Sequence, residues 1–388
     1  MSNILNPVEL TSALIKCRSI TPTSAGSIDL IISYLEPIGF TCTKLDFGQG
    51  DEKVENLYAR LGSLEPNICF AGHVDVVPTG DEQSWSIDPF GGEIKKGKIW
   101  GRGAADMKSG IAAFIAAISE FMERNNNLQD YGSISLIITS DEEGKAINGT
   151  KKVVEWLINK SEKISGCIVG EPTNVNQMGD TIKIGRRGSF TGSLTVKGIQ
   201  GHVGYPDLAE NPINSLLKML EPFSKIYLDK GTNEFQPSSV MVTTIDVNND
   251  ASNVIPGEVK AKFNIRFNTL HSVASLKSML KNQFDAITKN YEFDYFCNAE
   301  PFLTSDEELK STLQNAISKV VNVNPEKSTT GGTSDARFIT KLCPVIEFGL
   351  VGKTMHKIDE NVEVEDIMKL TNIYNKFLHN YFRVEKND

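Results

Sequence analysis

Two short segments place a histidine close to acidic residues, and such pairs can bind a divalent metal ion. His73 follows the apolar run Asn67–Phe70, and Asp75 lies two residues further on. Because residues i and i+2 of an extended backbone share a face, the Asp75 carboxylate can orient the imidazole, as metal-binding histidines usually require. His356 lies in the second segment, Thr354–Glu360. For both segments, the alternative is a polar surface loop with a histidine that is only hydrogen-bonded.

Three further segments supply carboxylates where apolar runs end or begin. Glu142 and Glu143 follow the run Ile134–Thr139, Glu171 follows a third apolar run, and Asp106 precedes a long apolar stretch with helical spacing. Adjacent acids repel one another unless a cation or a proton relieves the repulsion. Successive side chains diverge, so the two glutamates can face different partners. The alternatives are a solvated acidic turn and, for Asp106, a helix N-cap.

Histidines and carboxylates without cysteine suit zinc or another borderline divalent ion in a hydrolase. One histidine with one or two carboxylates can hold each ion, and a carboxylate shared by two ions would keep them about 3.5–4 Å apart. Taken alone, these residues therefore predict a carboxylate-rich metallohydrolase.

The elements that must position these residues read as an α/β domain. Buried strands are predicted at the apolar runs Asn67–Phe70, Ile134–Thr139 and Cys167–Val169, and helices at Ser27–Ile38 and Met107–Met122. This alternation predicts a mixed, largely parallel sheet with helices on both faces, a fold that places its sites at the carboxyl ends of strands.

From about Arg187 the pattern changes to alternating strands with two helical stretches, and it changes back after about Pro301. The order strand, helix, two strands, helix, strand predicts a small antiparallel α+β layer. The sequence therefore predicts a catalytic domain of residues 1–186 and 301–388, into which a small α+β domain of residues 187–300 is inserted.

Composition limits the partners and the compartment. The chain has 388 residues, more than one core usually holds, and its formal net charge of −9 disfavours nucleic acid or an anionic membrane as a partner. The six cysteines form no CxxC pair, and no window approaches the ~18 apolar residues of a membrane span. The start, MSNILNPVEL, lacks a basic region followed by an apolar stretch. These features predict a cytoplasmic protein with free thiols.

The segments GHVDVVP, WGRGAADMKSG, SDEEG, GEP and MHKIDE resemble, in this order and over almost the whole chain, the M20 metallopeptidase family. The resemblance implies an inserted small domain and two Zn²⁺ per subunit, for which Co²⁺ can substitute. His73 and Glu171 would bind one ion, His356 and Glu143 would bind the other, and Asp106 would bridge them.

The same resemblance assigns the catalytic groups. Asp75 would orient His73, and Glu142 would be the general base that takes a proton from water and passes it to the leaving amine. The family also tends to have a cis peptide after the bridging aspartate, which here is the bond between Asp106 and Met107.

Three further segments, KIGRRGS, GIQGHVGYP and GGTSDAR, resemble the succinyl-diaminopimelate desuccinylases within this family. Those enzymes release succinate and L,L-diaminopimelate from N-succinyl-L,L-2,6-diaminopimelate, on the route to lysine and peptidoglycan. Such a substrate carries several carboxylates, for which arginine is the expected anchor. The resemblance implies that Arg186 and Thr333 hold the succinyl carboxylate, and that Arg266 and Ser189 contact the diaminopimelate end.

A homodimer paired through the small domains is also implied by the resemblance. Asn253 and His202 would reach the active site of the other subunit, with His202 as an oxyanion donor, and Tyr205 of the same segment is a further substrate contact. One position departs from the pattern: Gly352 stands where desuccinylases often carry an asparagine that helps to bind the succinyl group. We expect the backbone N–H of Gly352, or a water molecule, to take its place.

Other activities remain as alternatives. Within the family these are acetylornithine deacetylase, aminoacylase and carboxypeptidase, against which the arginine pair and the GGTSDAR segment count. A non-catalytic relative that uses the fold for binding is the alternative from a different class. A non-catalytic relative should have lost some metal ligands or the general base. In this sequence, all five ligand positions and Glu142 are present.

Overall fold

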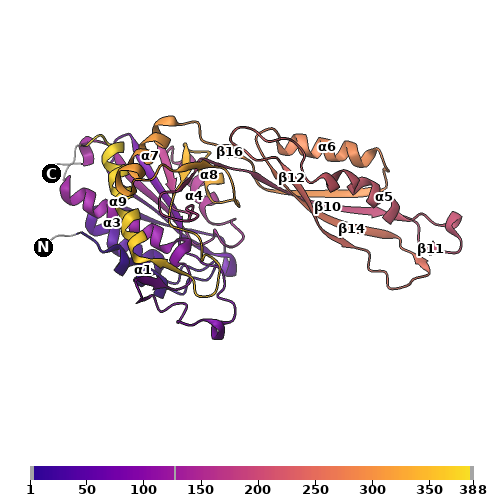
Figure 1. The fold of residues 1–388 in the computed structure, drawn as a ribbon, viewed down its shortest axis with the longest axis horizontal. Coiled ribbons are helices and arrows are strands. Elements are labelled where there is room, and N and C mark those ends of the chain that lie inside the picture. The colour runs from indigo at the N-terminus through magenta and orange to yellow at the C-terminus, as the bar shows by residue number, and fades with distance from the viewer. Residues whose placement is uncertain (1–3, 126–127, 385–388) are drawn as a thin grey trace. The chain divides into compact units, whose positions relative to one another are not determined.

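The three apolar runs predicted as buried strands lie side by side in the computed structural model, in an eight-stranded mixed sheet (Figure 1). Its order is β1-β2-β6-β3-β7-β18-β8-β17. The central neighbours β6, β3, β7 and β18 are parallel, whereas β1, β2 and β6 pair antiparallel. The strands are β1 Thr41–Phe47, β2 Val54–Leu61, β3 Asn67–His73, β6 Ser133–Thr139, β7 Gly166–Val169, β8 Thr181–Lys183, β17 Glu326–Ser328 and β18 Val345–Glu347.

The structure describes residues 4–125 and 128–384, which divide into two units. Unit 1 is formed by the described residues of Met1–Ile184, Thr304–Ser328 and Ser334–Asp388. Unit 2 is formed by Gly185–Leu303 and Thr329–Thr333.

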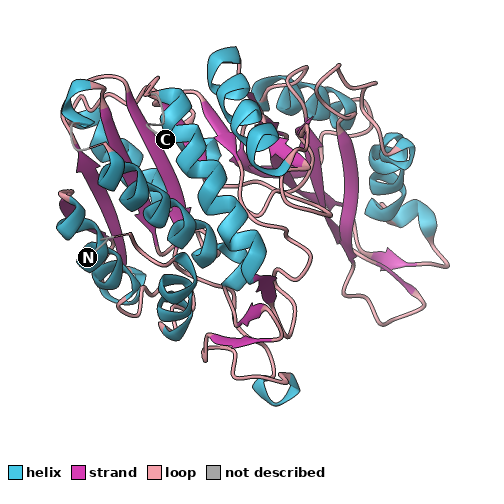
Figure 2. Cartoon of the chain, turned by 60° about the vertical axis from the view of Figure 1, so that its left-hand side comes forward, coloured by secondary structure: helices cyan, strands magenta, loops and turns pink. Residues whose placement is uncertain are grey.

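Helices cover both faces of the large sheet (Figure 2). On one face, Phe114 of α3 stacks on Phe70 of β3 with ring centroids 4.4 Å apart, and both rings meet Tyr374 of α9 edge-on. On the other face, Tyr58 of β2 contacts Trp156 of α4. The helices of unit 1 are α1 Pro7–Lys16, α2 Ser27–Leu35, α3 Ser109–Arg124, α4 Thr150–Asn159, α7 Glu307–Val321, α8 Ala336–Ile339 and α9 Val364–Tyr381.

The predicted largely parallel α/β architecture is therefore confirmed. Every residue of β3 and β6 is buried, which explains why these strands read as continuous apolar runs. A separate three-stranded sheet of unit 1 has the order β19-β5-β4, formed by Asn361–Glu363, Lys98–Trp100 and Glu93–Lys95. Among the described helices, none is both long enough and apolar enough to cross a bilayer.

Unit 2 contains a four-stranded antiparallel sheet of order β12-β14-β10-β15 and two longer helices. Phe263 of β14 is fully buried and contacts Phe223, Phe284 and Phe293, so this unit has a core of its own. Its elements are β10 Gly188–Lys197, β12 Ser239–Asp246, β14 Glu258–Phe267, β15 Tyr291–Ala299, α5 Pro212–Leu220 and α6 Val273–Asp285. A second small sheet pairs β11 Gly201–His202 with β13 Val254–Ile255.

The chain passes from unit 1 to unit 2 between Ile184 and Gly185 and returns to unit 1 between Leu303 and Thr304. β9, Gly185–Arg186, pairs with β16, Phe302–Leu303, so both short strands belong to unit 2. The segment Thr329–Thr333 also belongs to unit 2, because Thr329 Oγ1 donates to the carbonyl of Glu234 at 2.6 Å. Such a short excursion leaves no mark in hydrophobic periodicity, so the sequence could not reveal it.

Candidate active site

Four acidic or histidine side chains leave the carboxyl ends of three adjacent strands in unit 1. His73 ends β3, Glu142 and Glu143 follow β6, and Glu171 follows β7. Because β6, β3 and β7 are neighbours and parallel, their carboxyl ends meet at one edge of the sheet. The topology of the sheet therefore gathers residues that are about 100 positions apart in the sequence.

Asp106 reaches the same place from the turn Ala104–Lys108 (η4), which precedes α3. Its backbone is not helical, with φ −127° and ψ 96°, and α3 begins only at Ser109. The residue at the N-cap position is Lys108, and it caps through no side-chain hydrogen bond. The N-cap alternative for Asp106 is therefore wrong. The bond between Asp106 and Met107 is cis, as the resemblance implies.

The Asp106 carboxylate lies between the two histidines. Oδ1 is 3.1 Å from His73 Nε2, and Oδ2 is 3.2 Å from His356 Nε2. His73 Nε2 is also 3.8 Å from Glu171 Oε1, and His356 Nε2 is 2.8 Å from Glu143 Oε1. The five predicted ligands thus form two three-residue groups that share Asp106, and in each group the ligand atoms lie within 4.8 Å of one another.

This donor set fits a pair of divalent cations. Each group offers one imidazole nitrogen and two carboxylates, a combination that suits zinc and its neighbours among the transition metals. His73 is buried and His356 is half-exposed, so the cluster is accessible from one side. His356 also adopts a left-handed backbone, with φ 62°, which is uncommon for a non-glycine residue and turns its ring toward Asp106.

The pKa values of the predicted ligands are shifted because these side chains lie close together. Hydrogen bonds to Asp106 and Glu143 raise the pKa of His356 to about 10. Burial alone would lower the pKa of His73, but the hydrogen bond and charge of Asp106 raise it well above its usual value. Burial opposes ionisation of Asp106 too, yet the two histidines hold its pKa well below the usual range. Protonated imidazoles would therefore offset part of the carboxylate charge.

Glu142 lies beside this cluster, in a third group with His73 and Glu143. Burial, and then the charge of Glu171, raises the pKa of Glu142 well above its usual value. A carboxyl group that accepts a proton this readily, next to potential metal ligands, is suited to general acid–base chemistry.

Asp75 holds both His73 and the acidic turn. His73 Nδ1 lies 2.9 Å from the main-chain oxygen of Asp75 and 3.8 Å from its carboxylate, so the main chain accepts the ring's hydrogen bond. The Asp75 carboxylate instead accepts the N–H groups of Glu142 and Glu143, at 3.2 and 3.0 Å. Burial raises the pKa of Asp75 to about 6. This second contact was not predicted.

Asp141 is a neighbouring residue that sequence reasoning missed. Its carboxylate accepts three main-chain N–H groups, those of Ala146, Ile147 and Asn148, at 2.9 to 3.1 Å. These bonds fold the segment after the acidic turn back on itself. In the sequence, only the position of Asp141 within SDEEG pointed to a role for it. An acidic residue followed by a turn otherwise looks like part of any solvated loop.

The residues predicted to bind substrate all belong to unit 2, and one group of them lies where β10 starts and β14 ends. Arg186 Nη1 donates to the carbonyl of Thr330 at 3.1 Å, within the short segment that carries Thr333. Ser189 lies opposite Arg266 in the register of β10 and β14. The structure therefore brings the two predicted arginine sites to one region of unit 2.

The other group lies on the small sheet of β11 and β13. His202 pairs with Val254, next to Asn253, and the carbonyl of Asn253 accepts the N–H of Val203 at 3.1 Å. The rings of His202 and Tyr205 have centroids 5.7 Å apart, and both residues are exposed. β11 follows the far end of β10, as Figure 1 shows. Ten residues of strand at about 3.3 Å each put roughly 30 Å between the two groups.

The backbone N–H of Gly352, which we expected to replace an asparagine side chain, already has a hydrogen-bond partner. It donates to the carbonyl of Asn174 at 3.0 Å, so it is not available to replace an asparagine side chain. A Cβ at this position would stand 2.9 Å from the carbonyl oxygen of Pro172. A side chain here would force that backbone to move, which accounts for glycine at this position.

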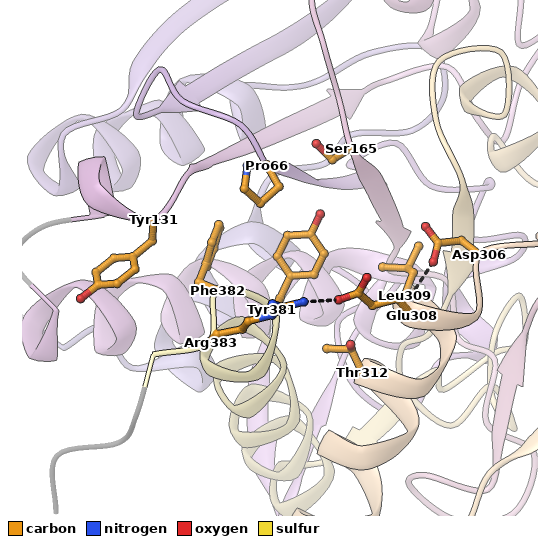
Figure 3. A pocket seen from close by; sticks show the side chains of 10 residues that line it. All are labelled: Pro66, Tyr131, Ser165, Asp306, Glu308, Leu309, Thr312, Tyr381, Phe382 and Arg383. Carbon is orange, nitrogen blue, oxygen red and sulfur yellow. Dashed lines mark hydrogen bonds and ion pairs between the residues drawn. The ribbon is translucent and has the colours of Figure 1, made fainter.

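A cavity of about 480 Å³ lies elsewhere in unit 1 (Figure 3). It lies where β3 and β7 begin, whereas the histidine and glutamates lie where these strands end. The described residues that line it include none of the predicted site residues; they are Pro66, Tyr131, Ser165, Asp306, Glu308, Leu309, Thr312, Tyr381, Phe382 and Arg383.

Metal binding by this cluster should depend on pH in a defined direction. Without metal, the proton on His356 stabilises the folded protein. This stabilisation is complete below about pH 6.5 and is lost as the pH rises through about 10, the raised pKa of His356. Zinc must displace the same proton, so its affinity should rise up to about tenfold per pH unit in this window. Titration calorimetry in buffers of different ionisation enthalpy would measure the protons released, and an affinity that does not change with pH would contradict the assignment.

The chain is similar to known proteins over almost its whole length. Residues 69–380 match the model of peptidase family M20/M25/M40. The chain is 52% identical to the succinyl-diaminopimelate desuccinylase of Rhodospirillum centenum over 97% of each chain, and 52% identical to that of Pelagibacter ubique over 97% of this chain and 99% of the relative.

Solved structures of lower identity share the fold. The M20 family metallo-carboxypeptidase of Sulfolobus solfataricus matches with a TM-score of 0.76 and 18% identity, over 98% of this chain and 100% of that chain. A dinuclear metal binding peptidase from Bacillus subtilis, also of the M20 family, matches with a TM-score of 0.70 and 15% identity, over 96% of each chain. The chain therefore belongs to the metallopeptidase family M20/M25/M40.

Proposed function

We propose that this protein hydrolyses N-succinyl-L,L-2,6-diaminopimelate to succinate and L,L-diaminopimelate, with two Zn²⁺ per subunit, for which Co²⁺ can substitute. The observation that carries the proposal is the pair of ligand groups that share Asp106, with the Glu142 carboxyl beside them. Relatives that are 52% identical over nearly the whole chain are named for this reaction. His73 and Glu171 would hold one ion, and His356 and Glu143 the other.

When bound, the metal pair would acidify a water molecule and polarise the amide carbonyl. The chain's own residues do the rest. Glu142 takes a proton from the attacking water and returns it to the nitrogen of the leaving amine, for which its raised pKa is suited. Asp75 keeps the His73 ring and the acidic turn in place through the bonds described above.

The anionic ends of the substrate would be bound in unit 2. Arg186 and Thr333 would hold the succinyl carboxylate, and Arg266 and Ser189 the diaminopimelate end. Burial, and then the charge of Arg187, lowers the pKa of Arg266. An anion placed between two neighbouring guanidinium groups would relieve their repulsion, which supports a carboxylate-binding role.

The spacing within unit 2 supports the proposal of a homodimer. His202, Tyr205 and Asn253 lie roughly 30 Å along the sheet from Arg186 and Ser189, farther than one small acylated amino acid reaches. If both groups contact substrate, they must therefore serve different active sites. We propose that His202 and Asn253 complete the site of a partner subunit, with His202 donating to the oxyanion.

Gly352 is the observation that favours a second candidate. Neither an asparagine side chain nor a free N–H is present there to hold the succinyl group, so a related M20 deacylase that acts on another acyl amino acid is the alternative. One fold carries many substrate specificities, so the residues that contact the acyl group decide between the two candidates.

Substrate cleavage tests the proposal directly. Chelator-treated protein, with and without added Zn²⁺, would be assayed on N-succinyl-L,L-diaminopimelate, N-acetylornithine and a panel of N-acyl amino acids. We expect zinc-dependent cleavage of the succinyl substrate, and a loss of about 10²–10⁴-fold in kcat in Glu142→Gln, because the proton acceptor is removed. Glu142→Gln should still bind two Zn²⁺. Cleavage confined to another substrate would favour the second candidate.

The dimer proposal has its own test. His202→Ala and Glu142→Gln would each be inactive alone, but mixed dimers would contain one site with Glu142 intact and His202 supplied by the partner. Random reassortment makes about half of the dimers mixed and restores one site in two, so about a quarter of wild-type activity should return. If His202 acted within its own chain, mixing would restore nothing. Glu142→Gln mixed with the double variant His202→Ala/Glu142→Gln is the control.

A further inference from the structure

Glu360 is a fully buried carboxylate with three donors and no role in the reaction described above. Its Oε1 accepts the main-chain N–H groups of Ala105 at 2.8 Å and of Asp106 at 3.2 Å. Its Oε2 accepts Arg102 Nη1 at 2.7 Å. One carboxylate therefore holds the turn that presents Asp106, from a position about 250 residues away in the sequence.

Arg102 extends this connection to the segment that carries His356. Arg102 Nη1 also donates to the carbonyl of Lys357 at 3.1 Å, and its guanidinium lies 5.1 Å from the Trp85 ring. The main-chain oxygen of Glu360 accepts the N–H of Gly101 at 2.9 Å. The turn of Asp106 and the segment of His356 are thus bonded to each other at several points, all of them away from the ligand atoms.

The Asp106 carboxylate must be oriented so that one oxygen faces His73 and the other faces His356. The backbone of Asp106 lies outside the helical conformation, so the following helix does not fix that direction. The N–H groups of residues 105 and 106 do fix it, provided that a buried acceptor holds both. Partners behind metal ligands commonly set the ligand's orientation in this way.

We propose that Glu360 is a positioning residue that holds the bridging Asp106 through its main-chain N–H groups; this rests on the metal centre of the proposed function. A buried ion pair by itself is a weak source of stability, because desolvation offsets the attraction between the charges. The pair with Arg102 therefore does not explain Glu360 as well as the two N–H groups do. Asp75 has the same relation to Glu142 and Glu143, whose N–H groups it accepts.

Two double variants separate the N–H acceptor from the ion pair. Arg102→Met/Glu360→Gln removes both charges but keeps an amide oxygen that can accept the N–H groups of Ala105 and Asp106. Arg102→Met/Glu360→Met removes both charges and the acceptor, with side chains of similar length. Neither leaves an unpaired buried charge, so both should fold, and circular dichroism would check this. Glu162→Met, which removes the partner of Arg60 elsewhere in unit 1, is the control for loss of an ion pair.

The readout is Zn²⁺ affinity, measured by competition with a chromogenic chelator on metal-free protein, without substrate. We expect the Gln double variant to stay within a few-fold of wild type, and the Met double variant to lose about 10–100-fold, as is common for partners behind metal ligands. Equal losses in both would show that the ion pair matters instead, and wild-type affinity in both would show that neither matters. Either result would overturn the proposal, whereas wild-type protein that binds no Zn²⁺ would refute the proposed function itself.

Discussion

The contact of one carboxylate, that of Asp106, with two histidines is the interaction on which the rest of the site depends. His73 and His356 lie far apart in the sequence, and Asp106 lies within 3.2 Å of both. Glu143 and Glu171 then flank the two imidazoles. Four carboxylates gathered in this space, with Glu142 included, repel one another unless positive charge balances them. The two histidines can carry part of that positive charge, since Asp106 raises the pKa of both, and a pair of divalent cations would supply more.

The turns that carry these ligands must be fixed by hydrogen bonds that do not use the ligand atoms themselves. The chain uses buried carboxylates that accept consecutive main-chain N–H groups: Asp75 for the acidic turn, Glu360 for the turn of Asp106, and Asp141 for the segment after β6. These acceptors bond to the backbone of Asp106, Glu142 and Glu143 and not to their side chains, so those side chains can face a metal ion. Charge-assisted bonds to N–H groups are short and strong, so a few of them are enough to order a loop.

Sequence reasoning found what local patterns encode and missed what distant contacts decide. The apolar runs of β3, β6 and β7 indicated buried parallel strands, and the residue types at their ends indicated a metal site. An aspartate before a helix, however, looks the same as an N-cap in the sequence, and the non-helical backbone of Asp106 and its contact with His356 distinguish it in the structure. Gly352 could not be understood either, since Asn174 and Pro172 restrict it through backbone contacts that leave no sequence pattern.

The residues predicted to hold the metal ions and the side chains predicted to bind substrate are divided between the two units. The five predicted ligands and Glu142 belong to unit 1, whereas the side chains predicted to contact the acyl or amino end belong to unit 2, which includes the segment Thr329–Thr333. Solved structures that are 15–18% identical keep this fold while their names differ from carboxypeptidase to dinuclear metal binding peptidase. The cluster around Asp106 sets the class of reaction, and it tolerates little change because each ligand atom has several neighbours. The predicted substrate residues Arg186 and Arg266 belong to the other unit, so a change of substrate there would not require a change of the ligands.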